Sequence, residues 1–236
     1  MFTLLHIDSS ARPGRSGEQP HGSHSRRLSA RFVQRWLERR PADQLIRRDV
    51  AASPPSPVTG SWAHAAFTPP GQREPWMRAT LAESDALVDE VLVADLLVIG
   101  APMYNFGMPS TLKAWIDNIV RVGRTFGFDR SRTGEPYWPL LAGQGKRAVL
   151  LGARGDYGYD PGGRLAHANH VEAGVMTPLH YIGIDAADTI AVEYDEFGDE
   201  RLDASIAAAE AHVDALVSRL LDEVPGQAKA VGRVVT

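Results

Sequence analysis

The chain has 236 residues, of which 44% are hydrophobic and 23% are charged, and its formal net charge is −4 at pH 7. This composition is typical of a globular domain and excludes a largely disordered chain, while the charge balance offers no overall attraction to nucleic acid or to an anionic membrane surface. The absence of cysteine excludes disulfides, thiolate nucleophiles and zinc–thiolate sites.

Short apolar runs alternate with longer amphipathic stretches from the N-terminus onward. Residues 2–7 predict a buried strand. Residues 25–40 predict a helix, because apolar side chains recur there at the spacing of one helix face. A weaker strand is predicted at 44–47, and the proline-rich stretch over 53–75 predicts a long irregular connection.

The same alternation continues through the second half of the chain. It predicts helices over residues 76–94, 109–122, 165–181 and 204–221, and strands over 96–99, 147–151 and 189–193. Strands that alternate with helices in this way indicate βαβ units and a parallel sheet. Five such strands fit the α/β flavodoxin-like order 2-1-3-4-5, with helices on both faces and a ligand beyond the carboxyl ends of the strands. We expect one domain over residues 1–224 and a mobile tail over 225–236.

The loop after the first predicted strand is rich in glycine and hydroxyl groups and leads into a helix. Backbone N–H groups at the start of a helix lack partners within it and bind anions readily. Ser10, Ser23 and Ser25 are therefore candidate ligands of a phosphate; the alternative is that Ser23 or Ser25 only caps the helix. The loop has neither a dinucleotide fingerprint nor a Walker motif, which leaves a site suited to a mononucleotide phosphate without metal.

The loop after the third predicted strand, residues 100–110, has the composition of a wall for a flat ring. Met103, Tyr104 and Phe106 supply apolar and aromatic surface. The amide of Asn105 can both donate to and accept from a polar ring edge. The alternative is that these aromatic side chains only cap the core.

The loop after the fourth predicted strand, residues 152–163, is glycine-rich. Glycine lets the backbone approach a ring closely. Arg154 either stabilises negative charge that develops on a reduced ring or pairs with a surface carboxylate, and the sequence leaves both open.

These three loops make the chain similar to the FMN-dependent NADH-azoreductase family, which overlaps with the NAD(P)H:quinone reductases. The resemblance covers essentially the whole chain. It is most specific at residues 102–106, 109–110, 112–117 and 123–126, and at Ser9-Ser10 and Ser23-His24-Ser25.

The resemblance implies a flavodoxin-like homodimer with active sites at the subunit interface, FMN as cofactor and NADH or NADPH as electron donor. It implies transfer of two electrons to quinones or azo compounds, and one site used twice implies ping-pong kinetics. The residues expected to bind the cofactor are Ser10, Ser23, His24, Ser25, Pro102, Met103, Tyr104, Asn105, Phe106, Ala153, Arg154, Gly155 and Asp156. Phe126 and Tyr157 are expected at the substrate pocket, with Tyr157 a candidate proton donor; no metal is expected.

The chain departs from the family pattern in two places. The third loop has Ala153-Arg154-Gly155-Asp156 where the family usually has Ser-Arg-Gly-Gly, and residues 13–22 look like an insertion in the first loop. We hypothesise that Asp156, if it lies near the ring, destabilises the anionic reduced flavin and lowers its potential.

Other readings stay open. His167 and His170 stand at i, i+3 in a predicted helix near Glu172, a spacing that metal sites use, but no third ligand converges with them. A non-enzymatic flavodoxin-like electron carrier or flavin-binding regulator would keep the FMN. A hydrolase or transferase would use the serine loop, although a Gly-x-Ser-x-Gly elbow is absent and the histidines have no evident serine partner. Because the N-terminus has no basic leader and no apolar run is long enough to span a bilayer, we expect a cytoplasmic protein.

Overall fold

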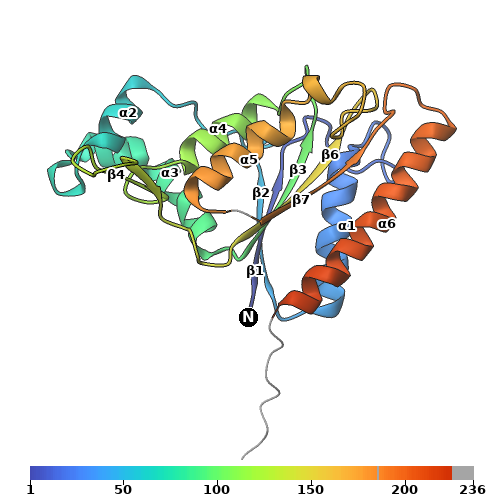
Figure 1. Cartoon of the computed structure of the whole chain (residues 1–236), viewed down its shortest axis with the longest axis horizontal. Helices are drawn as coiled ribbons and strands as arrows, with labels where there is room; N and C mark the ends of the chain where they lie inside the picture. The colour runs from blue at the N-terminus through green and yellow to red at the C-terminus, as the bar shows by residue number, and fades with distance from the viewer. Residues whose placement is uncertain (185, 225–236) are drawn as a thin grey trace, which may run out of the picture.

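A parallel sheet of five strands forms the centre of the protein (Figure 1). The computed structural model describes residues 1–184 and 186–224, and the tail expected over 225–236 lies outside them. The strands are β1 (Thr3–Asp8), β2 (Gln44–Asp49), β3 (Leu96–Pro102), β6 (Arg147–Ala153) and β7 (Ala186–Val192). Their order is β2-β1-β3-β6-β7. Because β4 and β5 lie outside this sheet, the order is the predicted 2-1-3-4-5, and the flavodoxin-like prediction is confirmed.

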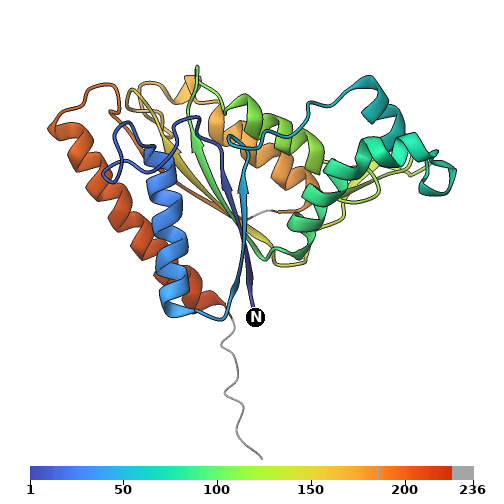
Figure 2. The ribbon, with the colours of Figure 1, turned by 180° about the vertical axis from the view of Figure 1, so that it is seen from behind.

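Helices cover both faces of the sheet. On one face lie α1 (His24–Arg39) and α6 (Glu200–Glu223), side by side in Figure 2. On the other lie α3 (Pro75–Val93), α4 (Ser110–Ile119) and α5 (Val171–Ile182).

The two cores share the strands by alternation of side chains. Leu96 and Val98 of β3 pack with the α1 and α6 side. Leu97 and Ile99 pack with the α3, α4 and α5 side. Successive side chains of a strand point to opposite faces of the sheet, and helices cover both faces. Each central strand is therefore apolar at nearly every position, and its sequence is a continuous apolar run.

The proline-rich stretch over 53–75 is not irregular throughout, so this prediction was wrong in part. It contains α2 (Gly60–Phe67) and the short 3-10 helix η1 (Pro70–Gln72). Thr59 caps α2, since its hydroxyl accepts a hydrogen bond from the backbone N–H of Trp62 at 3.2 Å. The prolines flank this helix and do not interrupt it.

The helix predicted over 165–181 also begins later than expected. Residues Ala166–Ala168 form a separate 3-10 turn, η2, and α5 starts at Val171. The side chain of Asn169 accepts from the N–H of Val171 at 3.2 Å, which favours a helix start at this point. His167 and His170 therefore do not share a helix face.

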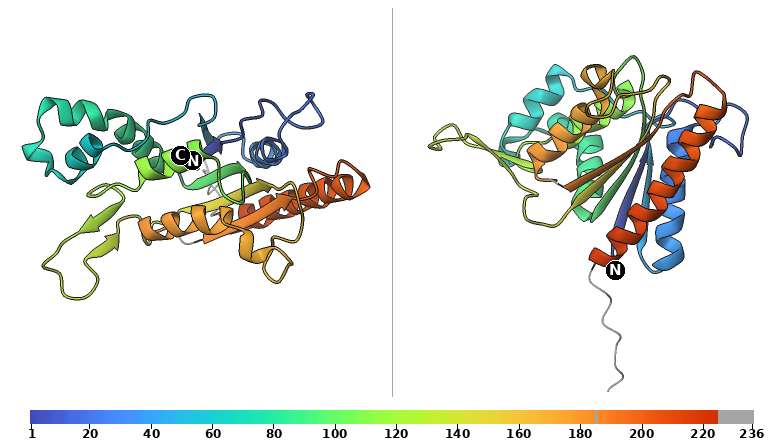
Figure 3. Two further views of the ribbon diagram at one scale, coloured as in Figure 1. Left: turned by 90° about the horizontal axis from the view of Figure 1, so that it is seen from above. Right: turned by 45° about the vertical axis from the view of Figure 1, so that its right-hand side comes forward.

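A hairpin that the sequence did not predict projects from the body of the molecule (Figure 3). It consists of β4 (Phe126–Phe128) and β5 (Tyr137–Pro139), paired antiparallel. Aromatic packing supports it: the ring centroids of Phe128 and Tyr137 are 4.7 Å apart. Within the described ranges, no helix is long and apolar enough to cross a bilayer.

Candidate functional site

The three loops singled out in the sequence converge on one hollow, at the carboxyl edge of the parallel sheet. The residues that line it are Ser10, Arg12, Ser23, His24, Pro102, Met103, Tyr104, Ala153, Gly155, Asp195 and Glu196. Eight of these eleven are residues that the family resemblance implies for cofactor binding. Arg12, Asp195 and Glu196 are additions that sequence reasoning missed.

The serines form a buried polar end of the hollow. Ser23 is the N-cap of α1, and its Oγ accepts from the N–H of Arg26 at 3.3 Å and lies 3.0 Å from Oγ of Ser25. Oγ of Ser10 accepts from the N–H of Arg12 at 3.2 Å. Ser23 thus caps the helix and also lines the hollow, so the two readings of this residue are compatible. Hydroxyls beside the N-terminus of a long helix are suited to an anion.

A row of side chains closes this polar end. Oγ of Ser16 lies 2.8 Å from Nδ1 of His24, whose Nε2 lies 3.2 Å from Oδ1 of Asp195. The other oxygen of Asp195 accepts from Nη1 of Arg12 at 3.0 Å. The hydrogen bond to His24, aided by Arg12, lowers the pKa of Asp195 although partial burial opposes this. Asp195 follows the last parallel strand, and the shared edge of the strand ends was the signal that could have found it.

The second loop is a tight turn with an uncommon backbone. The N–H of Tyr104 donates to Gly107 O at 2.8 Å and the N–H of Gly107 donates back at 3.1 Å. Asn105 and Phe106 between them have φ values of 49° and 68°, the pattern of a type I′ turn. Left-handed φ at a phenylalanine is strained, and such strain gathers at functional sites. Both residues are exposed at the tip, while Met103 and Tyr104 line the hollow.

Hydrogen bonds fix the second loop against its neighbours. The hydroxyl of Tyr104 accepts from the N–H of Ala11 in the first loop at 3.1 Å. The N–H of Met103 donates to Ala153 O at 2.8 Å, and the N–H of His170 donates to Phe106 O at 3.0 Å. Three hydrogen bonds to neighbouring segments therefore anchor the wall expected for a flat ring.

Arg154 is a buried cation in an ion-pair cluster of the third loop, and its carboxylate partners are more exposed than the arginine itself. Its side chain is 3% exposed, and it contacts Glu172, Glu193 at 2.9 Å and Asp160 at 2.8 Å. Burial lowers the pKa of Arg154, but these carboxylates outweigh burial and raise it. Of the two alternatives that the sequence left open, the structure displays pairing with carboxylates, and Glu172 is committed to this pair.

The third loop meets the hollow through Ala153 and Gly155. A Cβ at position 155 would lie 2.5 Å from Oε1 of Glu196, so the glycine gives the two loops room to approach. Asp156 is instead paired with Arg164, which holds the pKa of that carboxyl below its usual range. The cofactor roles expected of Arg154 and Asp156, and the proposed effect of Asp156 on flavin potential, stay predictions.

The two residues expected at a substrate pocket lie in different places. Tyr157 stacks on Tyr194 at 4.7 Å, next in the chain to Asp195. Phe126, the first residue of β4 in the hairpin, packs on Tyr181 at 5.1 Å, whereas the lining of the hollow comes from other elements of the described chain. In the described ranges no three histidine or carboxylate side chains gather to hold a metal ion.

The chain is similar to known proteins over most of its length. A family profile described as a flavodoxin-like fold matches residues 3–217. An FMN-dependent NADH:quinone oxidoreductase of Idiomarina loihiensis is 42% identical over 220 residues, covering 93% of this chain and 91% of the relative. An FMN-dependent NAD(P)H:quinone oxidoreductase of Pseudomonas aeruginosa is 44% identical over 195 residues, covering 82% of this chain and 91% of the relative.

A solved structure agrees in fold alone. The crystal structure of an azoreductase from Bacillus anthracis superposes with a TM-score of 0.80 at 23% identity, over 93% of this chain and all of that one (100%). The family profile and the two sequence relatives decide the family. The chain belongs to the FMN-dependent NADH:quinone oxidoreductases, within the flavodoxin-like fold.

Proposed function

We propose that the chain is an FMN-dependent oxidoreductase that carries two electrons from NADH or NADPH to quinones or azo compounds. The observation that carries the proposal is the convergence of the serine loop, the Met103–Tyr104 wall and Gly155 on one hollow. The activities for which the two sequence relatives are named support it. We also propose a cytoplasmic location, as expected from the sequence.

The residues present suit this cofactor. Buried hydroxyls of Ser10 and Ser23 beside the start of α1 suit its phosphate. Pro102, Met103 and Tyr104 offer apolar surface for its ring, and Gly155 leaves backbone bare beside it. Bound FMN would accept a hydride from the nicotinamide and return two electrons to the acceptor.

The protein's own contribution is position and electrostatics. Donor and acceptor would use the same face of the bound cofactor in turn, which gives ping-pong kinetics. Hydrogen bonds fix the second loop, so the wall loses little conformational entropy when an aromatic compound stacks on it. Tyr157, which stacks on Tyr194, stays a candidate proton donor.

We further propose that the chain acts as a homodimer. Phe126, expected to wall the acceptor site, belongs to the projecting hairpin and packs there with Tyr181 and Tyr137, apart from the residues that line the hollow of its own chain. A second copy can bring such a hairpin to the site. Tyr137 and Tyr181 are large aromatic side chains left 42% and 38% exposed, as expected of a surface that another molecule covers.

One observation favours a second candidate, a hydrolase. His24 does have a serine partner: Ser16, His24 and Asp195 form a serine–histidine–aspartate row, which corrects the expectation that no histidine has one. An acyl-transfer site also needs N–H donors for the oxyanion, and the N–H of Ser16 is already donated to Ser23 O at 3.2 Å. We therefore rank this candidate second.

The visible spectrum of the purified protein separates these functions. We expect a flavin spectrum that bleaches on anaerobic addition of NADH and recovers when a quinone is added. A flavin spectrum that neither NADH nor NADPH changes would indicate the electron carrier or regulator. A colourless protein that takes up no FMN but cleaves p-nitrophenyl acetate, with loss of cleavage in Ser16→Ala, would establish the hydrolase.

A further inference from the structure

The hydroxyls and the helix start at the polar end of the hollow suit a phosphate, but the charged side chains that line the same hollow are negative on balance. Arg12 contributes one positive charge, while Asp195 and Glu196 contribute two negative ones. With His24 neutral these side chains sum to −1, and a phosphate monoester adds a charge of about −1.5 to −2 near pH 7. Like charges brought this close repel each other unless a proton is taken up.

His24 can take up that proton without moving. Its Nε2 faces Oδ1 of Asp195 at 3.2 Å, so the carboxylate fixes a proton on this nitrogen. Its Nδ1 faces the hydroxyl of Ser16 at 2.8 Å. A hydroxyl donates to a neutral imidazole and can rotate to accept from a protonated one. Both forms of His24 therefore have a full set of hydrogen bonds in the same position.

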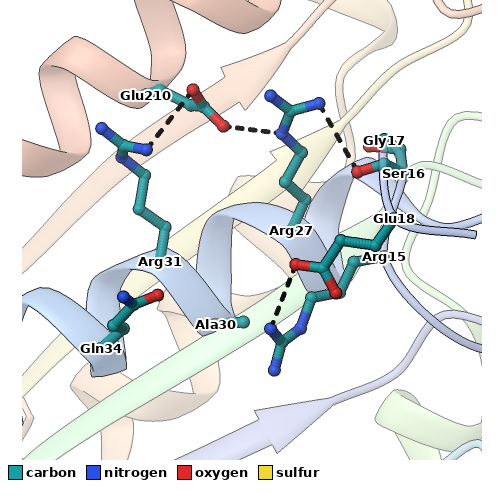
Figure 4. Close-up of a pocket in the computed structure, with 9 residues that line it drawn as sticks. All are labelled: Arg15, Ser16, Gly17, Glu18, Arg27, Ala30, Arg31, Gln34 and Glu210. Carbon is teal, nitrogen blue, oxygen red and sulfur yellow. Dashed lines mark hydrogen bonds and ion pairs between the residues drawn. The ribbon is translucent and has the colours of Figure 1, made fainter.

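Hydrogen bonds to the backbone of Ser16 fix its position. Its N–H donates to Ser23 O at 3.2 Å. A second hollow, between the first loop, α1 and α6, contains the other support (Figure 4): Arg27 donates to Ser16 O at 3.5 Å and to Glu210 at 2.6 Å. Ser16 lies within the 13–22 insertion, so this segment, which departs from the family pattern, supplies the partner of His24.

Asp195 is also fixed by hydrogen bonds from its backbone and to its side chain. Its N–H donates to Arg154 O at 3.2 Å, and its second oxygen is occupied by Arg12 at 3.0 Å. The charged groups that face His24 are thus Asp195 and, through it, Arg12, with Glu196 on the same wall. Ser16, on the remaining side, is uncharged.

We propose that His24, held between Ser16 and Asp195, senses the charge of the cofactor's phosphate, so that FMN binding takes up a proton at this imidazole. The inference rests on the proposed function only in that FMN is the ligand. Because the bound phosphate favours protonated His24, FMN affinity is highest at low pH and falls as the pH rises through the range in which the complex loses this proton. Arg12 and Asp195 are positioning residues for this exchange.

The test is the pH dependence of flavin affinity in apoprotein. FMN and riboflavin, which lacks the phosphate, are titrated by fluorescence quenching between pH 6.5 and 8.5, and calorimetry in two buffers of different ionisation enthalpy counts the protons taken up. We expect the Kd of wild type for FMN to rise by up to about tenfold per pH unit, and the Kd for riboflavin to stay level. The phosphate's own second ionisation, near pH 6, acts in the opposite direction.

The matched variant is His24→Gln, which keeps an N–H for Asp195 but cannot gain a proton. We expect it to bind FMN with a Kd that does not rise with pH and with no proton uptake. Equal pH slopes and equal proton uptake in wild type and variant overturn the inference, and turnover of NADH with a quinone then still supports the proposed function. Failure of both flavins to bind at every pH overturns both.

Discussion

The guanidinium of Arg154 lies 2.9 Å from the carboxylate of Glu193, and this pair joins the start of the third loop to the end of β7. Glu193 also accepts from the N–H groups of Gly158 and Tyr159, at 3.1 and 3.2 Å. One carboxylate thus fixes both ends of a turn whose first residues, Ala153 and Gly155, wall the hollow. Arg154 therefore supports the site indirectly: it fixes Glu193, and Glu193 fixes the turn.

We expect Arg154→Met to lower the free energy of unfolding by about 1–3 kcal/mol, because it leaves the half-buried carboxylates of Glu172 and Glu193 without their buried cation. The third loop should loosen with it and weaken FMN binding. Urea denaturation and FMN titration measure the two effects. The control is Arg164→Met, which removes an arginine that is 45% exposed and should cost no more than about 1 kcal/mol.

The double variant Arg154→Met/Glu193→Gln checks the cause. Neutralising one stranded carboxylate should recover part of the lost stability. If the double variant is as unstable as the sum of its two single changes, the two residues act independently and the proposed link is wrong.

Asp43 is expected to make stability sensitive to acid. Its side chain is 1% exposed; burial alone would raise its pKa, but hydrogen bonds from Arg40, Trp36 and the N–H of Phe2 outweigh burial and lower it. A carboxyl whose folded pKa lies below its unfolded value of about 4 stabilises the fold fully above that value, and the contribution is lost as the pH falls through the folded pKa. Asp43→Asn should therefore be less stable than wild type by about 1–3 kcal/mol at pH 7.

Urea unfolding between pH 7 and pH 3 measures this dependence. The gap between wild type and Asp43→Asn should narrow below about pH 4, where the wild-type carboxyl begins to protonate. Asp222→Asn, at an exposed position of α6, serves as the control and should follow wild type throughout. A gap that stays constant down to pH 3 would mean that the charge of Asp43 is not what stabilises the fold.

The sheet was predictable because its signal is local. Val98 and Ile99 belong to a short apolar run with β-branched side chains, which favours a buried strand, and this run is visible without knowing what packs on it. The helix α2 was not predicted, because the many prolines of residues 53–75 indicate irregular structure. These prolines lie outside Gly60–Phe67, and the cap residue Thr59 is a weaker signal than they are.

The loops of the site were predictable one by one, and their contacts were not. Arg12 and Asp195 are 183 residues apart in the chain, and each looks like an ordinary surface charge when read alone. Ser16 belongs to the insertion, where no family pattern pointed to it. Strand order and loop conformation together decide which charged side chains meet at the edge of the sheet. A local sequence pattern predicts neither of them.

Asn105 allows the backbone of the second loop to be separated from its side chain. Its φ of 49° costs a residue such as alanine about 1 kcal/mol or more, and glycine almost nothing. We expect Asn105→Ala to lower the free energy of unfolding by about 1 kcal/mol and Asn105→Gly to leave it nearly unchanged. Both remove the amide expected at the ring edge, so FMN affinity should fall in both. Unaltered FMN affinity in Asn105→Gly would show that the amide does not contact the ring.

Gly22 is the position at which the first loop can be opened with a single methyl group. A Cβ there would lie 2.2 Å from the carbonyl of Arg15, which is backbone and cannot swing aside. We expect Gly22→Ala to lower the free energy of unfolding by about 1–3 kcal/mol and to move Ser16 away from His24. FMN should then bind more weakly, and the pH dependence of its Kd should diminish, because the hydroxyl that accepts from protonated His24 is lost.

Gly60→Ala, where no atom lies within 4 Å of the added carbon, is the matched control and should retain both the stability and the FMN affinity of wild type. If Gly22→Ala binds FMN as wild type does at every pH, the first loop tolerates the displacement, and Ser16 is not needed to hold His24.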